Sequence, residues 1–120
     1  MMNVLFVGLG GAIGAILRYV IGLLPYKSDF PILTLFINLV GAVVIGFITG
    51  LAVKKNISEH AMLFFKTGLC GGFTTFSTFS LEAYTLFKNG SVLLAILYII
   101  LSIALCLIGI VLGMSIAKRM

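Results

Sequence analysis

The chain carries very little charge for its length of 120 residues. Asp, Glu, Lys and Arg together make up 9% of it, whereas 62% of the residues are hydrophobic and the mean hydropathy is +1.30. A soluble domain usually carries about 25% charged residues. The deficit therefore excludes an ordinary soluble domain and indicates an integral membrane protein. Only a few short connections are polar, so we expect residues 1–120 to form a single transmembrane domain.

The residue types that perform catalysis or bind metals are also scarce. The chain has three acidic residues, one histidine and two cysteines, and nothing in their arrangement resembles a nucleophile–base pair or a set of metal ligands. This pattern argues against an enzyme. Cys70 and Cys106 both lie in apolar segments, where two buried, inert thiols are favoured over a disulfide or a metal site. The basic residues are scattered among the loops, which suits anionic lipid headgroups and gives no argument for nucleic acid.

Long apolar segments fill most of the chain, over residues 4–24, 32–53, 61–87 and 92–117. Each is long enough to cross a hydrocarbon core of about 30 Å as a helix. The sequence therefore predicts an all-α membrane protein with four transmembrane helices. In such a topology the basic residues divide five against three between the two sides, with Lys54, Lys55, Lys66, Lys118 and Arg119 facing Arg18, Lys27 and Lys88. This bias is weak, so the chain could insert in both directions.

The third segment contains a stretch that suits a continuous membrane helix poorly. Gly71 and Gly72 loosen the backbone, and five hydroxyl side chains follow them, at positions 74, 75, 77, 78 and 80. These hydroxyls can compete with the helix for backbone hydrogen bonds. We therefore expect a broken helix near residues 71–76, which a membrane tolerates only where it is buried in protein or lines a watery cavity. The alternative is that the hydroxyls only join neighbouring helices.

Two phenylalanines accompany the break. Phe76 and Phe79 lie three residues apart, so both rings should share one face of the resumed helix. Glu82 continues that face. An acid within a span is a functional candidate, unless the helix ends soon after it and leaves the carboxylate near water.

Polar residues in the other segments are also candidates for a role at the break. Arg18 either reaches a lipid headgroup or places positive charge at the mouth of an anion path. Asn38 shares a helix face with Thr34, and its amide can donate to an anion or to backbone exposed by the break. Tyr98 and Ser102 lie four residues apart on the last segment and form a mildly polar face with Cys106.

These residues together resemble the Fluc (CrcB) fluoride channel family over essentially the whole chain. The resemblance rests on the segment 10–19 (GGAIGAILRY), on Thr34 with Asn38, on the segment 71–80 (GGFTTFSTFS) with Glu82, and on Tyr98 with Ser102. One departure is Cys106, which stands where some members have a further serine.

The resemblance implies a fluoride-selective channel that exports the ion passively from a bacterial cell. It implies an antiparallel, dual-topology homodimer in the inner membrane, with two pores and one structural sodium ion at its centre. The backbone carbonyls of Gly71 and Thr74 would bind the sodium. The fluoride pathway would be formed by Arg18, Thr34, Asn38, Phe76, Ser77, Thr78, Phe79, Tyr98 and Ser102.

Two other classes of membrane protein are alternatives to a channel. A small multidrug-type, proton-coupled antiporter has a similar length and a dual-topology dimer, but it needs a carboxylate in the middle of its first helix, where this chain has no Asp or Glu. A non-transporting assembly subunit would have no use for the polar chemistry of residues 71–80.

Overall fold

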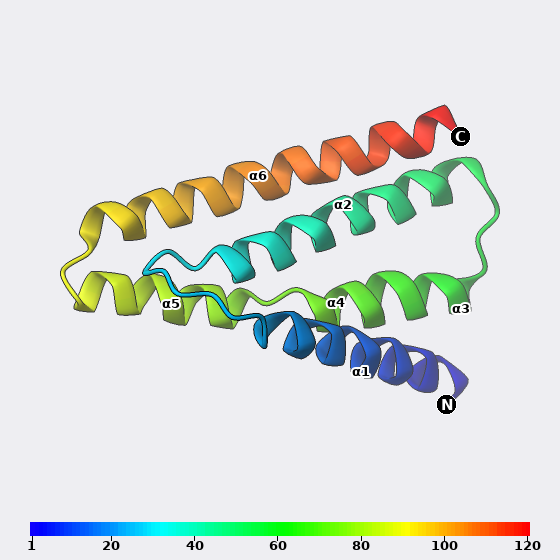
Figure 1. Cartoon of the computed structure of the whole chain (residues 1–120). Coiled ribbons are helices and arrows are strands. Elements are labelled where there is room, and N and C mark those ends of the chain that lie inside the picture. The colour runs from blue at the N-terminus through cyan, green and yellow to red at the C-terminus, as the bar shows by residue number, and fades with distance from the viewer.

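The computed structural model describes all 120 residues, and they form helices without any β-strand (Figure 1). Three helices are long and apolar enough to cross a membrane, namely α1 (Met2–Gly22), α2 (Ile32–Lys54) and α6 (Val92–Arg119). The prediction of an all-helical membrane protein is thus confirmed for these three helices. The remaining segment, between Glu59 and Lys88, consists of four shorter helical pieces: α3 (Glu59–Met62), η1 (Leu63–Cys70), α4 (Gly71–Phe73) and α5 (Phe76–Lys88).

The segment between Glu59 and Lys88 begins with an N-cap. The Ser58 hydroxyl accepts a hydrogen bond from the amide of Ala61 at 3.2 Å, which satisfies one of the free amides at a helix start. The first helical residue is therefore Glu59, two positions before the predicted start. The next turns, in η1, are π-helical, a feature that no residue pattern predicted. The segment ends at a turn where Gly90 adopts a φ of +82°, a conformation that favours glycine.

Helical geometry is lost at Thr74 and Thr75. Their φ and ψ angles are −80° and 157°, and −149° and 114°, which describe extended backbone. Gly71 is helical, with φ −64° and ψ −38°, and Gly72 lies within α4. The expected unwinding at the glycine pair is therefore wrong. Gly72 serves close packing, because a Cβ atom at this position would collide with the backbone of Gly11.

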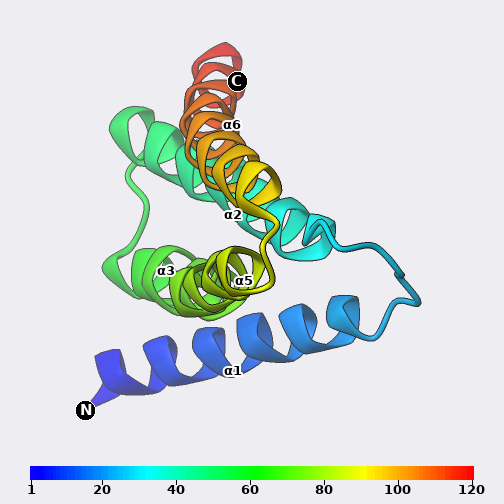
Figure 2. The same cartoon turned by 90° about the vertical axis from the view of Figure 1, so that its left-hand side faces the viewer.

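The helices pack as two crossed pairs (Figure 2). Helix α1 lies against η1 and α4, and the approach is close because Cβ atoms at Gly10 and Gly14 would collide with backbone atoms of η1 and α4. Helix α2 packs along α6, where Gly46 and Gly113 remove the side chains at the crossing. Small residues at helix contacts are the usual device for such approaches in membranes.

A small core joins α5 to the second pair. It contains Leu35 of α2, Ala83 and Leu86 of α5, and the fully buried Ala95 and Tyr98 of α6. These contacts fix the position of the helix that resumes after the break.

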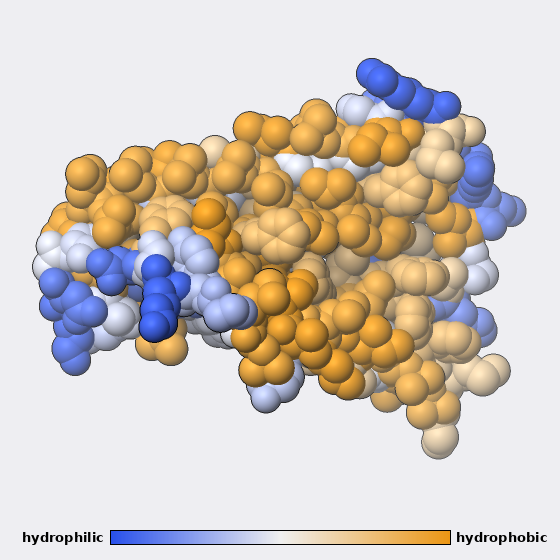
Figure 3. Space-filling model, viewed as in Figure 1, coloured by the Kyte–Doolittle hydropathy of each residue, from blue (hydrophilic) through white to orange (hydrophobic).

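The outer surface is apolar around the middle of the molecule and polar at its two ends (Figure 3). Only 20 of 120 residues are buried, so most large apolar side chains need a nonpolar solvent around them. Both chain termini lie at the same end of the molecule (Figure 1). The shape and surface suit a lipid bilayer.

Candidate functional site

The extended backbone at the break is held by one side chain of α2. The Oδ1 atom of Asn38 accepts a hydrogen bond from the amide of Thr75 at 2.8 Å, and its Nδ2 atom donates to the carbonyl of Thr75 at 3.2 Å. Both polar groups of one extended residue are therefore satisfied by a single amide. A carboxamide has two N–H groups, so Asn38 keeps one donor for another partner.

The two helix ends at the break have further partners. The hydroxyl of Thr75 accepts a hydrogen bond from the amide of Thr78 at 3.2 Å and so caps the start of α5. The Nε atom of Arg18 donates to the carbonyl of Gly72 at 3.2 Å, one of the free acceptors at the end of α4. Arg18 is half-buried, so its guanidinium supports the break as well as placing positive charge beside it.

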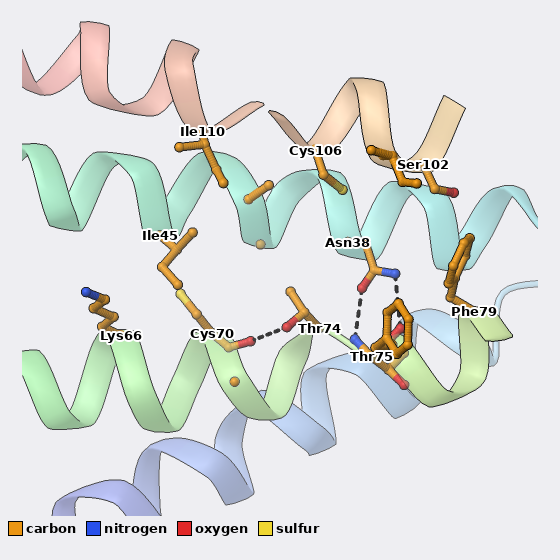
Figure 4. A pocket seen from close by; sticks show the side chains of 15 residues that line it. Asn38, Ile45, Lys66, Cys70, Thr74, Thr75, Phe79, Ser102, Cys106 and Ile110 are labelled. Atoms are coloured by element: carbon orange, nitrogen blue, oxygen red, sulfur yellow. Dashed lines mark hydrogen bonds between the residues drawn. The ribbon is translucent and has the colours of Figure 1, made fainter. Parts of the chain in front are cut away.

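A cavity of about 370 Å³ lies on one side of the break, between α2, α6 and the interrupted segment (Figure 4). Six of the predicted site residues line it, and they come from all three parts: Asn38, Gly71, Thr74, Phe76, Phe79 and Ser102. We call this space the first cavity. The rest of its wall includes Thr75, Lys66, Cys70 and Cys106, together with apolar residues of α2 and α6.

The two phenylalanines differ in their surroundings. Their ring centroids lie 5.7 Å apart, in agreement with the shared face that their spacing predicts. The Phe76 side chain is 80% exposed. Phe79 is partly buried and lies against the Tyr98 ring, with centroids 5.1 Å apart. Phe79 is thus fixed by packing, whereas Phe76 projects from the molecule.

The hydroxyl of Ser102 has no hydrogen-bond partner although its oxygen is buried. The residue is 7% exposed and lines the first cavity. A buried hydroxyl without a partner costs about 1–3 kcal/mol. Ser102 therefore keeps an unused hydrogen-bonding group beside the cavity.

A second cavity of about 450 Å³ lies on the other side of Thr75, which lines both spaces. The second cavity is lined by Arg18, Thr34, Thr78 and Glu82 among others. Its wall carries one positively charged side chain, Arg18, and one carboxylate, Glu82, whereas no carboxylate lines the first cavity.

Glu82 is the centre of a hydrogen-bonded group in this region. Its Oε1 atom accepts from the Thr34 hydroxyl at 2.7 Å, and its Oε2 atom accepts from the Tyr98 hydroxyl at 2.7 Å. Both bonds are short and charge-assisted when the carboxylate is ionised. A hydroxyl has one proton, so Thr34 and Tyr98 have no donor left while these bonds persist.

The structure places the predicted residues unevenly. Thr34, Thr78 and Arg18 line the second cavity, and Tyr98 lies behind Phe79 without lining either space. Ser77 is exposed, lines neither cavity, and has its hydroxyl 3.5 Å from that of Thr75. Sequence reasoning missed that Thr75 lines both cavities, and it used Lys66 only in the charge balance between the two sides of the membrane.

The carbonyls of Gly71 and Thr74 have lost their usual helical partners. In a continuous helix the amides of Thr75 and Thr78 would bind them, but these amides donate to Asn38 and to the Thr75 hydroxyl instead. No three His, Cys, Asp or Glu side chains gather in the chain. A cation at this place would therefore depend on hard carbonyl oxygens, which suit an alkali or alkaline-earth ion.

The fold and these two cavities define a small helical membrane protein with a polar interruption in one helix. The family model described as "CrcB-like protein, Camphor Resistance (CrcB)" matches residues 5–114. The chain belongs to this family, which confirms the resemblance seen in its motifs.

Curated relatives cover nearly the whole chain. The chain is 48% identical to the "Fluoride-specific ion channel FluC" of Ruminiclostridium cellulolyticum, over 98% of this chain and 94% of that protein. It is 42% identical to the protein of the same name from Azobacteroides pseudotrichonymphae, over 92% of each chain. The protein of that name from Rhodopseudomonas palustris is also 42% identical, over 98% of each chain.

Proposed function

We propose that the chain is a fluoride-specific ion channel and has no enzymatic activity. The observation that supports this most directly is the first cavity, which Asn38, Phe76, Phe79 and Ser102 line together in a protein of the CrcB family. Its relatives named above are fluoride-specific channels. Family membership also favours a channel over the proton-coupled antiporter.

The chemistry of the cavity suits a small anion that must lose its water. A phenyl ring is positive at its edge and negative on its face, so Phe76 and Phe79 can line an anion path edge-on without binding the ion firmly. Ser102 and the second N–H of Asn38 supply stronger contacts. Conduction needs such a mixture, because each site must bind well enough to admit the ion and weakly enough to release it.

The second cavity would form the other part of the pathway. Arg18 would raise the positive potential there, and Thr34 and Thr78 would supply hydroxyls. Ser77 and Tyr98 line neither cavity, so they would contribute only where the route continues outside these two spaces. Thr34 and Tyr98 are bound to Glu82, so they can donate to fluoride only after the carboxylate releases them. Passive flow would then export fluoride, because hydrofluoric acid enters a cell in its neutral form and ionises inside.

The working unit would be an antiparallel homodimer in the bacterial plasma membrane. In this arrangement the segment from α3 to α5 is a fourth crossing, interrupted at Thr74 and Thr75. Phe76 is exposed, and the first cavity is bordered by extended backbone. Both support an interface here, because a second copy of the chain would shield them from lipid. The weak charge bias supports subunits of opposite orientation.

A single cysteine near Lys27 and another near Lys118 test this arrangement. In an antiparallel pair these sites on different subunits share a membrane side and should crosslink to each other. Crosslinks formed only between identical positions would instead indicate a parallel pair.

A sodium ion would occupy the centre of that dimer, held by the carbonyls of Gly71 and Thr74 from both subunits. The residues present fit such an ion, because the carbonyls of Gly71 and Thr74 both lack their helical partners. When bound, the ion would add positive potential to both anion paths.

Fluoride efflux from proteoliposomes, read with a fluoride-selective electrode, tests the function. We expect rapid fluoride efflux and negligible chloride efflux under the same gradient. Equal rates for the two anions, or no fluoride efflux from a correctly folded protein, would refute the proposal.

A further inference from the structure

Lys66 is the one formally charged side chain that lines the first cavity. It comes from η1 and points into the space between η1 and α2, on the side of the cavity opposite Phe79 (Figure 4). The side chain is exposed. Its position in the wall differs from that of a lysine that merely extends along a helix toward a headgroup.

Nothing on the wall of the first cavity neutralises this charge. The chain has only three carboxylates, at Asp29, Glu59 and Glu82, and none of them lines the first cavity. The other cation beside the break, Arg18, lines the second cavity and shares it with Glu82. Each side of the break therefore has one cation, and only the cation of the first cavity has no acid on the same wall.

We propose that Lys66 sets the affinity of the first cavity for anions by raising their local concentration at its mouth. This proposal rests on the function proposed above. Eight positions separate Lys66 from Thr74, and because the turns of η1 are π-helical these positions span at most about 12 Å along the axis. At that distance and an effective dielectric constant near 20, one charge changes the occupancy by an anion about tenfold at low salt.

The effect should appear in binding and not in the maximal rate. A charge at the mouth attracts fluoride before it reaches Phe76 and Phe79. It therefore changes the fluoride concentration at which the flux is half-maximal. Once the cavity is saturated, the same charge no longer limits conduction. Added salt should weaken the effect, because the screening length falls from about 10 Å at 0.1 M to about 3 Å at 1 M.

Fluoride flux measured over a range of fluoride concentrations tests the proposal with Lys66→Gln, Lys66→Glu and Lys66→Arg. At low ionic strength, adjusted with a large impermeant salt, Lys66→Gln should raise the half-saturating concentration about three- to tenfold and leave the maximal flux unchanged. Lys66→Glu should change the logarithm of that concentration by about twice as much, and Lys66→Arg should keep the wild-type value. Lys55→Gln, in the exposed loop after α2, is the matched control and should behave as wild type.

Each outcome separates this inference from the proposed function. If the wild type conducts no fluoride, the channel function itself fails. If the wild type conducts fluoride and Lys66→Gln has the same half-saturating fluoride concentration at low salt, the role of Lys66 is refuted. A loss of function in Lys66→Arg would also refute it, since that would indicate a structural role. Lys66→Met keeps the apolar part of the side chain and replaces Lys66→Gln if the latter does not fold.

Discussion

The bond between Asn38 and the helix break gives the most direct test of the site. Substitution Asn38→Asp keeps the shape of the side chain and one acceptor for the amide of Thr75. It replaces the Nδ2 donor by an oxygen, which then faces the Thr75 carbonyl at a place where the two groups are now 3.2 Å apart. Two acceptors in contact without a proton between them destabilise the break, by about 1–3 kcal/mol.

The added charge should act on the ion more strongly than on the fold. A sphere with the volume of the first cavity, about 370 Å³, has a radius of about 4.5 Å. An anion at its centre would thus lie about 6 Å from a carboxylate on the wall, where an effective dielectric constant near 20 gives a repulsion of about 3 kcal/mol. This energy corresponds to an occupancy about 100-fold lower.

Fluoride efflux from proteoliposomes measures the loss of flux, and thermal unfolding in detergent measures the loss of stability. Asn38→Ala removes both hydrogen bonds to Thr75 without adding charge, so it should also lose stability but retain more flux than Asn38→Asp. Asn56→Asp makes the same chemical change in an exposed loop and should change neither quantity. A wild-type rate in Asn38→Asp would refute the placement of Asn38 beside the ion.

Three further predictions follow from the break and its surroundings. Gly72→Ala should destabilise the protein by about 1–3 kcal/mol in thermal unfolding, because a Cβ atom collides with the backbone of Gly11. Gly8→Ala is its control and should be tolerated, since nothing lies within 4 Å of a Cβ there; equal losses would refute the packing argument. Phe76→Ile should reduce fluoride flux sharply without dissociating the proposed dimer in size-exclusion chromatography, and an unchanged flux would remove the ring from the pathway. Replacing all sodium by a large organic cation should reduce fluoride flux, whereas unchanged flux would leave ordered water as the partner of the Gly71 and Thr74 carbonyls.

Part of the architecture could be predicted from the sequence because it depends on composition and local pattern. The scarcity of charge predicts a membrane protein, and long apolar runs predict the helices α1, α2 and α6. The spacing of Phe76 and Phe79 predicts that their rings lie together. Such features follow from hydropathy and helical periodicity, which neighbouring residues already determine.

The break shows where local reasoning reaches its limit. The glycine pair suggested unwinding at Gly71, yet the helix continues to Phe73. Helix α1 packs so closely against Gly72 that a side chain would not fit there. Extended backbone begins at Thr74, and Asn38 of α2 supplies the partners for Thr75. Tertiary contacts thus decide which residues unwind, and one sequence contains no direct record of these contacts.

The hydrogen bonds of Glu82 were hidden for the same reason. They join residues 48 and 16 positions apart in the chain, so no local motif marks them. The π-helical turns of η1 likewise have no proline or other residue signal before them.

The interruption at Thr74 and Thr75 also affects how such a protein can enter a membrane. At this point the carbonyl end of α4, which is partially negative, meets the amide end of α5, which is partially positive. The break can therefore present one sign of charge to a cation and the other to an anion through its own backbone, with the Arg18 guanidinium bound to the carbonyl of Gly72 beside it. An ionised residue at the centre of a membrane helix costs about 2.5–3.5 kcal/mol on insertion scales, and backbone ends buried between helices avoid this cost. They also add no Lys or Arg that would favour one orientation of the chain over the other.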